Sequence, residues 1–176
     1  MTVLVTGGSA SGKSAFAEML LARLSSKGRV YVATMEVFDE ESRKRVARHR
    51  AQRADKGFIT VERPRHLAGA DIPTGAAVLL EDLPNLVAGE MFGGGDAARI
   101  VPDLTRLAER CDHLVVVTGD VFTDGATYDP ATQSYLRTLG EASRAVAAMA
   151  DAVVEVVCSL PVILKGALPC LGLTDC

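Results

Sequence analysis

The sequence contains no tryptophan and few aromatic residues of any kind, since phenylalanine and tyrosine make up 5% of its 176 residues. Proteins that bind single-stranded nucleic acid stack the bases on aromatic side chains, so this composition argues against such a platform. The formal net charge of −3 gives no overall positive surface for nucleic acid or anionic lipid. The composition therefore predicts no nucleic-acid partner for the surface as a whole.

Cysteine pairs at metal-binding spacing and long apolar runs are also missing. The cysteines at positions 111, 158, 170 and 176 form no CxxC motif, so we expect free thiols, with Cys111 and Cys158 buried among apolar residues. No apolar stretch reaches the ~20 residues that a membrane span requires. The segment Met1–Thr6 lacks the basic start of a signal peptide. We therefore expect no membrane span and a cytoplasmic location.

What the sequence does have is an alternation of short apolar runs with longer amphipathic segments. The runs are typical of strands buried on both faces of a parallel sheet, and they occur at Val3–Thr6, Arg29–Ala33, Phe58–Val61, Ala77–Glu81, His113–Thr118 and Ala152–Val157. Helical periodicity follows at Lys13 to about Ser26, Asp39–Arg53, Ala97–Arg110 and Pro130 to about Met149. Gly28 is expected to end the first helix and Asp129 to cap the last. The pattern predicts an α/β fold, a mostly parallel sheet flanked by helices, with residues 1–176 in a single domain.

The turn after the first predicted strand carries a phosphate-binding motif. The segment GGSASGKS matches G-x-x-x-x-G-K-[ST] and lies between a predicted strand and a predicted helix, as the motif requires. Its glycines let backbone N–H groups turn toward a phosphate, its lysine adds positive charge, and its last hydroxyl can ligand Mg²⁺. We therefore predict a P-loop nucleotide site formed by Gly7, Gly8, Ser9, Ala10, Ser11, Gly12, Lys13 and Ser14.

A second motif predicts the metal side of this site. The apolar strand Ala77–Glu81 is followed by Asp82, so it ends in two acids, like the Walker-B strand whose carboxylate orients Mg²⁺. Many strands end in an acidic residue, so the signal gains its weight from the phosphate loop beside it. Our candidate metal ligands are Ser14, Glu81 and Asp82.

The most unusual stretch is basic, because six of the twelve residues from Ser42 to Arg53 are lysine or arginine. Such a helix can be a solvated face, an electrostatic patch for polyphosphate or nucleic acid, or part of a catalytic site. On a helix, Arg45, His49 and Arg53 share one face, and a neutral imidazole can attack phosphorus near pH 7. The spacing alone leaves these interpretations open.

A longer series of residues distinguishes among them. It runs from Val5-Thr6-Gly7-Gly8 and Ser11–Ser14 through Ala33-Thr34, Asp39, Glu41, Arg45, His49, Arg53, Phe58, Thr60, Glu62, Pro64 and Leu67 to Leu160-Pro161 and Lys165-Gly166. In order and spacing it resembles the bifunctional adenosylcobinamide kinase/adenosylcobinamide-phosphate guanylyltransferase family of cobalamin assembly, over about residues 2–166. The resemblance implies a P-loop NTPase fold of the RecA-like type and a homotrimer.

The same resemblance implies the activity and its residues. It implies that adenosylcobinamide is phosphorylated and that GMP then passes from GTP to adenosylcobinamide phosphate through a guanylylated His49, with Lys13 as the second catalytic residue. ATP, GTP and Mg²⁺ are the implied cofactors, and the corrinoid is the implied small-molecule partner. Besides the phosphate loop, the implied nucleotide-site residues are Ala33, Thr34, Met35, Arg50, Ala51, Gln52, Arg53, Glu62 and Glu81.

The chain departs from the family pattern at positions where we expect the corrinoid to bind. The departures are Pro84 after the acidic pair, Gly119-Asp120 after the fifth strand and Ser143-Arg144 on the last helix. They leave the nucleotide half intact and concern the identity of the acceptor. Two alternatives stay open: a P-loop small-molecule kinase in which His49 merely binds phosphate, and a RecA-like nucleotide-dependent switch or nucleic-acid-binding module that uses the basic helix.

Overall fold

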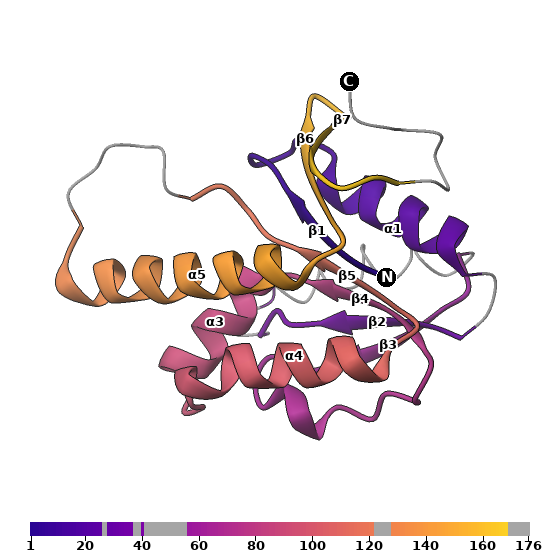
Figure 1. The fold of residues 1–176 in the computed structure, drawn as a ribbon. Coiled ribbons are helices and arrows are strands. Elements are labelled where there is room, and N and C mark those ends of the chain that lie inside the picture. The colour runs from indigo at the N-terminus through magenta and orange to yellow at the C-terminus, as the bar shows by residue number, and fades with distance from the viewer. Residues whose placement is uncertain (26–27, 37–39, 41–55, 122–127, 169–176) are drawn as a thin grey trace.

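The computed structural model describes residues 1–25, 28–36, 40, 56–121 and 128–168 (Figure 1). The predicted basic helix, with His49, Arg50, Ala51, Gln52 and Arg53, lies outside the described residues, as do the cysteines at 170 and 176. The strands are β1 (Thr2–Thr6), β2 (Arg29–Ala33), β3 (Phe58–Glu62), β4 (Ala77–Glu81), β5 (His113–Val117), β6 (Ala152–Val157) and β7 (Leu160–Lys165). The helices are α1 (Lys13–Leu24), α3 (Leu83–Phe92), α4 (Ile100–Arg110) and α5 (Pro130–Met149), with short 3-10 helices η2 (Leu67–Gly69) and η3 (Ala97–Arg99).

The strands form one seven-stranded sheet in the order β3-β2-β4-β5-β1-β6-β7. All neighbours pair in parallel except β7, which runs antiparallel to β6. The predicted α/β fold with a mostly parallel sheet is confirmed. Because parallel strands end at one edge, the segments that follow β1, β2 and β4 meet there, which places the phosphate loop and the acidic pair side by side.

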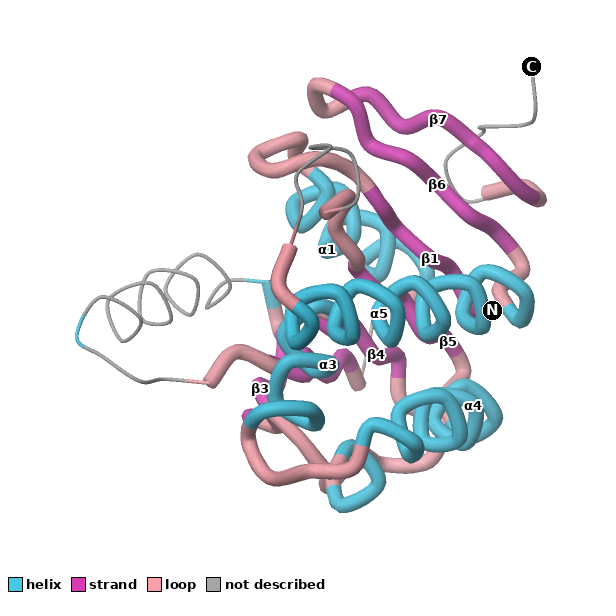
Figure 2. The backbone as a smooth tube through the Cα atoms, turned by 90° about the vertical axis from the view of Figure 1, so that its left-hand side faces the viewer, coloured by secondary structure: helices cyan, strands magenta, loops and turns pink. Residues whose placement is uncertain are grey.

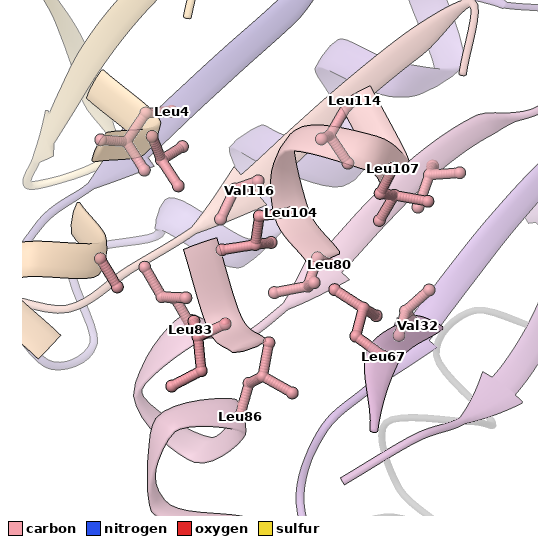
Figure 3. Packing of buried hydrophobic residues seen from close by; sticks show 14 of the residues in the cluster. Leu4, Val32, Leu67, Leu80, Leu83, Leu86, Leu104, Leu107, Leu114 and Val116 are labelled. Carbon is pink, nitrogen blue, oxygen red and sulfur yellow. The ribbon is translucent and has the colours of Figure 1, made fainter. Parts of the chain in front are cut away.

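Helices cover both faces of the sheet, as Figures 1 and 2 show, with α1 on one face and α3, α4 and α5 on the other. Successive residues of a strand point to opposite faces, so Val3 and Val5 pack with Phe16 and Leu20 of α1, while Leu4 faces the other layer. That layer is largely built from leucines of α3 and α4 packed on β4 and β5 (Figure 3). Burial on both faces explains why the inner strands β1, β2, β4, β5 and β6 are continuous apolar runs rather than alternating ones.

Helix α3 and strand β7, like the short 3-10 helix η2, were not predicted. Helix α3 contains Pro84 and Gly89, which interrupt the helical pattern, although Asp82 caps its first turn by accepting a hydrogen bond from the Asn85 N–H. Strand β7 follows a two-residue turn, Cys158-Ser159, in which both residues have positive φ without being glycine or asparagine. That turn carries no sequence signal, so the antiparallel hairpin was missed.

Other boundaries and burial predictions need correction as well. The first helix ends at Leu24 with Ser25 as its C-cap, so Gly28 lies beyond the helix end and does not terminate it. The predicted helix Ala97–Arg110 begins as the 3-10 helix η3 and becomes α-helical at Ile100. Cys158 is exposed rather than buried, because it forms the hairpin turn, and Cys111 is only partly buried.

The start of the last helix is as predicted. The Asp129 carboxylate accepts hydrogen bonds from the N–H groups of Ala131 at 2.9 Å and Thr132 at 3.2 Å, and Pro130 is the first helical residue. This pairing leaves the first turn of α5 with its N–H groups satisfied. In the described part of the chain, no helix combines the length and the apolar character that crossing a membrane would demand.

Candidate functional site

The phosphate loop connects β1 to α1 at the carboxyl edge of the sheet. Gly12 lies just before α1 with a φ of 93°, and a Cβ at this position would lie 2.6 Å from the Oγ of Ser159. A Cβ at Gly7 would lie 2.5 Å from the carbonyl oxygen of Val156. Both distances are too short for a side chain, so these two positions require glycine. No side chain of the described residues caps the N-terminus of α1, which leaves its N–H groups available to an anion.

Backbone hydrogen bonds from neighbouring segments hold this loop in place. The Ser159 N–H, in the β6–β7 turn, donates to the Ser11 carbonyl at 2.8 Å, and the Asp120 N–H donates to the Gly7 carbonyl at 3.3 Å. The Lys13 ammonium donates to the Gly8 carbonyl at 3.1 Å. That hydrogen bond leaves the other N–H groups of Lys13 for a phosphate. The loop is therefore braced from both sides by the segments that follow β5 and β6, the two strands that flank β1.

The acidic end of β4 lies against the first turn of α1. The Ser14 hydroxyl donates to Oε1 of Glu81 at 2.6 Å, whereas Oε2 of Glu81 is buried and finds no hydrogen-bond partner among the described residues. Burial, with the nearby charge of Asp82, raises the pKa of Glu81 to about 7, against the lowering effects of Ser14 and Lys13. An unpartnered carboxylate oxygen beside a hydroxyl is a set of hard oxygen ligands, so these residues fit Mg²⁺.

Asp82 has a different task in the structure. Its Oδ1 accepts from the Asn85 N–H at 2.9 Å and so caps α3, and burial raises the pKa of its carboxyl group. The Thr34 side chain is hydrogen-bonded both to the Asp82 N–H, at 2.6 Å, and to the Asp82 carbonyl, at 2.7 Å. The peptide bond between Glu81 and Asp82 is cis. Because the Asp82 carboxylate already caps α3, Glu81 is the better placed of the two acids to receive a metal.

Several of the predicted nucleotide-site residues lie together at this edge. Glu62, Ala33 and Glu81 occupy one row across β3, β2 and β4, because Ala33 is the register partner of both acids. Thr34 follows in the next row and is fully buried. Of the expected departures from the family pattern, Ser143 lies near the end of β5, with its Oγ 3.4 Å from that of Thr118. The catalytic candidate His49 and the residues 50–53 lie outside the described part of the chain.

A cavity of about 550 Å³ opens beside the phosphate loop. It is lined by Ala10, Ser11, Gly12, Lys13, Ser14, Ala15, Glu18 and Lys56. Glu18 and Lys56 were not predicted as site residues, and they form an ion pair in the cavity wall. The sequence could have predicted Glu18 as a site residue, because it lies four residues after Ser14 and so on the same face of α1. Lys56 carried no signal because its place depends on the tertiary fold.

Among the described residues, no group of three or more histidine, cysteine, aspartate or glutamate side chains comes together to hold a metal ion. A magnesium ion at a P-loop takes most of its ligands from phosphates and water, so one carboxylate and one hydroxyl suffice from the protein. The pair Ser14–Glu81 therefore remains the candidate metal site of this region.

Comparison with known proteins decides the family. Residues 3–164 match the family described as "Cobinamide kinase / cobinamide phosphate guanyltransferase". The chain belongs to this family. The bifunctional adenosylcobalamin biosynthesis protein CobU of Salmonella typhimurium is 30% identical over 184 residues, which cover 94% of this chain and 100% of that protein. CobU of Escherichia coli is 41% identical over 100 residues, 54% of each chain, and CobP of Pseudomonas aeruginosa is 29% identical over 94% of this chain and 98% of its own length.

The solved structures agree with the fold. The flagellar accessory protein FlaH from Methanocaldococcus jannaschii superposes with a TM-score of 0.51, covering 95% of this chain and 79% of that one, at 10% sequence identity. At this identity the likeness concerns the fold alone, and it agrees with a mostly parallel sheet flanked by helices. The family resemblance inferred from the sequence is confirmed, and the chain is an enzyme of a kinase and guanylyltransferase family of cobalamin biosynthesis.

Proposed function

We propose that this enzyme phosphorylates adenosylcobinamide and then transfers GMP from GTP to adenosylcobinamide phosphate, through a guanylylated His49. The observation that carries the proposal is the braced phosphate loop beside the Ser14–Glu81 pair, in a chain that belongs to the cobinamide kinase family. The loop supplies a place for a nucleotide triphosphate, and the pair supplies oxygen ligands beside it.

In the kinase step, the acceptor hydroxyl attacks the γ-phosphorus of ATP or GTP. The bond from that phosphorus to the bridging oxygen breaks, the nucleoside diphosphate leaves, and the hydroxyl proton passes to solvent. Lys13 and the N–H groups at the start of α1 stabilise the negative charge on the transferred group. Ser14 and Glu81 would hold Mg²⁺, which when bound neutralises phosphate charge.

In the guanylyl step, the neutral imidazole of His49 attacks the α-phosphorus of GTP, and pyrophosphate leaves. A phosphate oxygen of adenosylcobinamide phosphate then attacks the same phosphorus, the N–P bond breaks, and the imidazole is regenerated. Dividing the transfer in this way lets one nucleophile serve two displacements. The sequence supports this role for His49, since Arg45 and Arg53 share its face of the predicted helix.

The test is incubation of the protein with GTP labelled at the α-phosphate, followed by denaturation. We expect a protein-bound label that acid removes and alkali does not, and we expect none in His49→Ala. GTP labelled at the γ-phosphate is the control and should leave no such label on the protein. A wild-type chain that phosphorylates adenosylcobinamide but takes up no α-label would contradict the guanylyl step and favour a kinase alone.

A further inference from the structure

An ion pair outside the predicted motifs lies in the wall of the phosphate-loop cavity. The Lys56 ammonium bonds to Oε2 of Glu18, and both residues line the cavity together with the loop. Among the described residues of that lining, Lys13, Glu18 and Lys56 are charged. The lining therefore carries a net positive charge, although the protein as a whole is acidic.

Glu18 is a fixed partner for this lysine. It lies on α1 one turn beyond Ser14, and its side chain is 10% exposed. A buried carboxylate needs a compensating charge, because burial without one is costly. Its charge also reaches the metal side of the site, where it raises the pKa of Glu81. Glu18 thus holds the Lys56 ammonium at a set distance from the first turn of α1.

The backbone beside Lys56 is fixed as well. Gly57 follows with a φ of 66°, and Phe58 begins β3 with its ring in edge contact with Tyr31, at 6.2 Å between ring centroids. The guanidinium of Arg29 lies over the same ring at 5.5 Å. These contacts anchor the start of β3, so the position of the ammonium depends on packing as well as on its ion pair.

The Lys56 side chain nevertheless keeps access to the cavity, because it is 45% exposed while paired. An ammonium group has more N–H donors than one carboxylate oxygen uses, so donors are left for an anion in the cavity. A lysine tied to a neighbouring acid offers such an anion a positioned charge at a smaller cost in side-chain entropy than an unattached one.

We propose that Lys56 binds the polyphosphate of the nucleotide, as a second ammonium group beside Lys13, and that Glu18 positions it. The proposal rests on the nucleotide site proposed above and adds to it a contact that the phosphate-loop motif does not contain. Since the contact is to phosphate, its contribution to affinity increases with the number of phosphates on the nucleotide.

The test compares GTP, GMP and guanosine by calorimetry on the full chain with Mg²⁺ present. We expect Lys56→Gln to bind GTP about ten-fold or more weakly, GMP less weakly, and guanosine with wild-type affinity. Lys56→Arg should restore most of the GTP affinity, since it keeps the charge. Arg23→Gln is the matched control, because it removes the same charge from an exposed residue in the last turn of α1.

Each outcome bears on the proposal. If Lys56→Gln binds GTP as tightly as Arg23→Gln does, Lys56 is a structural partner of Glu18 and the proposal is wrong, whereas the nucleotide site stands. If the unaltered chain binds no GTP, or if Lys13→Ala leaves GTP binding intact, the nucleotide site itself is wrong. Should Lys56→Gln fail to fold around an unpaired Glu18, the double variant Glu18→Gln/Lys56→Gln removes that unpaired charge, and the proposal requires the same loss of GTP affinity in it.

Discussion

The phosphate loop and the acidic end of β4 meet at Ser14, but they are held in different ways. Backbone hydrogen bonds from the β6–β7 turn and from Asp120 brace the loop, and two of its glycines have no room for a side chain. The end of β4 is tied mainly by side chains, through the Thr34 and Ser14 hydroxyls, besides one backbone bond from the Thr34 N–H to the Glu81 carbonyl at 3.0 Å. One buried carboxylate oxygen of Glu81 has no partner among the described residues.

The difference indicates which part of the site is complete before a ligand arrives. A loop fixed by its own backbone presents N–H groups in place, so little ordering remains to be done on binding. The ionised form of a buried carboxyl group with a raised pKa destabilises the fold. A bound cation compensates that buried negative charge and removes the destabilisation. We therefore expect changes in the loop to reduce affinity directly, and changes at Glu81 to act through metal and pH.

The largest effect is expected at Gly12. Substitution by alanine places a Cβ 2.6 Å from the Oγ and 3.3 Å from the Cα of Ser159 at a φ of 93°, so the loop or the β6–β7 turn must shift. We expect the affinity for GTP to fall about a hundred-fold, since losing one or two loop hydrogen bonds to a charged phosphate costs about 1.5–3 kcal/mol each. Titration calorimetry measures the loss.

A second glycine supplies the control for this substitution. Gly94 also has a positive φ, at 82°, but a Cβ there would meet no atom of the described residues within 4 Å. Gly94→Ala therefore carries a similar backbone strain without the clash, and it should lose stability while it binds GTP as the wild type does. Equal losses of GTP affinity in the two variants would show that backbone strain, rather than the contact with Ser159, weakens binding.

The next effect concerns stability and pH. The pKa of Glu81 is raised from 4.5 to about 7 in the folded protein, so the folded state binds its proton more tightly than the unfolded state does. The stabilising contribution is complete below pH 4.5 and is lost as the pH rises through 7. Glu81→Gln cannot ionise, so at pH 8 it should exceed the wild type in free energy of unfolding by ~2–3 kcal/mol.

Urea titrations at pH 4 and pH 8 measure this difference, without nucleotide or metal. The two proteins should converge at the lower pH, where Glu81 is protonated in both the folded and the unfolded wild type. A gap that stays the same at both pH values would show that packing, rather than ionisation, distinguishes the variant. With Mg²⁺ and GTP added, the wild type should gain more stability than Glu81→Gln does.

A smaller effect is expected from removing the hydroxyl group that joins the two regions. Ser14→Ala removes one candidate metal ligand and the hydrogen bond that lowers the pKa of Glu81. We expect about a ten-fold loss of GTP affinity in the presence of Mg²⁺ and little loss in EDTA. Lys13→Ala, in contrast, should weaken binding under both conditions. A loss of the same size for Ser14→Ala with and without Mg²⁺ would contradict its role as a ligand.

The same contrast explains what the sequence predicts well. The phosphate loop and the acidic end of β4 are local: each is a short motif at the end of an apolar run, and the parallel sheet brings the ends of the runs together. Strands β1 to β6 were predicted within one residue at each end for the same reason, because burial on both faces of the central strands leaves a continuous apolar signal. The register that aligns Glu62, Ala33 and Glu81 follows from this arrangement.

Features that depend on tertiary contact could not be predicted in this way. In the sequence, Lys56 is an ordinary charged residue before a strand and matches no motif. The pairing of β3 with β2 is what brings its side chain to Glu18. Helix α3 was missed because Pro84 and Gly89 obscure its periodicity. A carbonyl contact explains that glycine, since a Cβ at Gly89 would lie 2.0 Å from the carbonyl oxygen of Pro64. Long-range contacts of this kind leave no local pattern.

The smallest effect is expected in the turn that braces the loop. Cys158 has a φ of 49°, a conformation that costs most side chains about 1–2 kcal/mol and asparagine less. Its side chain is exposed, while the bracing hydrogen bond comes from the neighbouring Ser159 N–H. Cys158→Asn should therefore raise the free energy of unfolding by about 0.5 kcal/mol and leave GTP affinity unchanged. Denaturant titration measures the free energy of unfolding, and calorimetry measures GTP affinity. A loss of GTP affinity in this variant would mean that the conformation of the turn itself also sets the geometry of the loop.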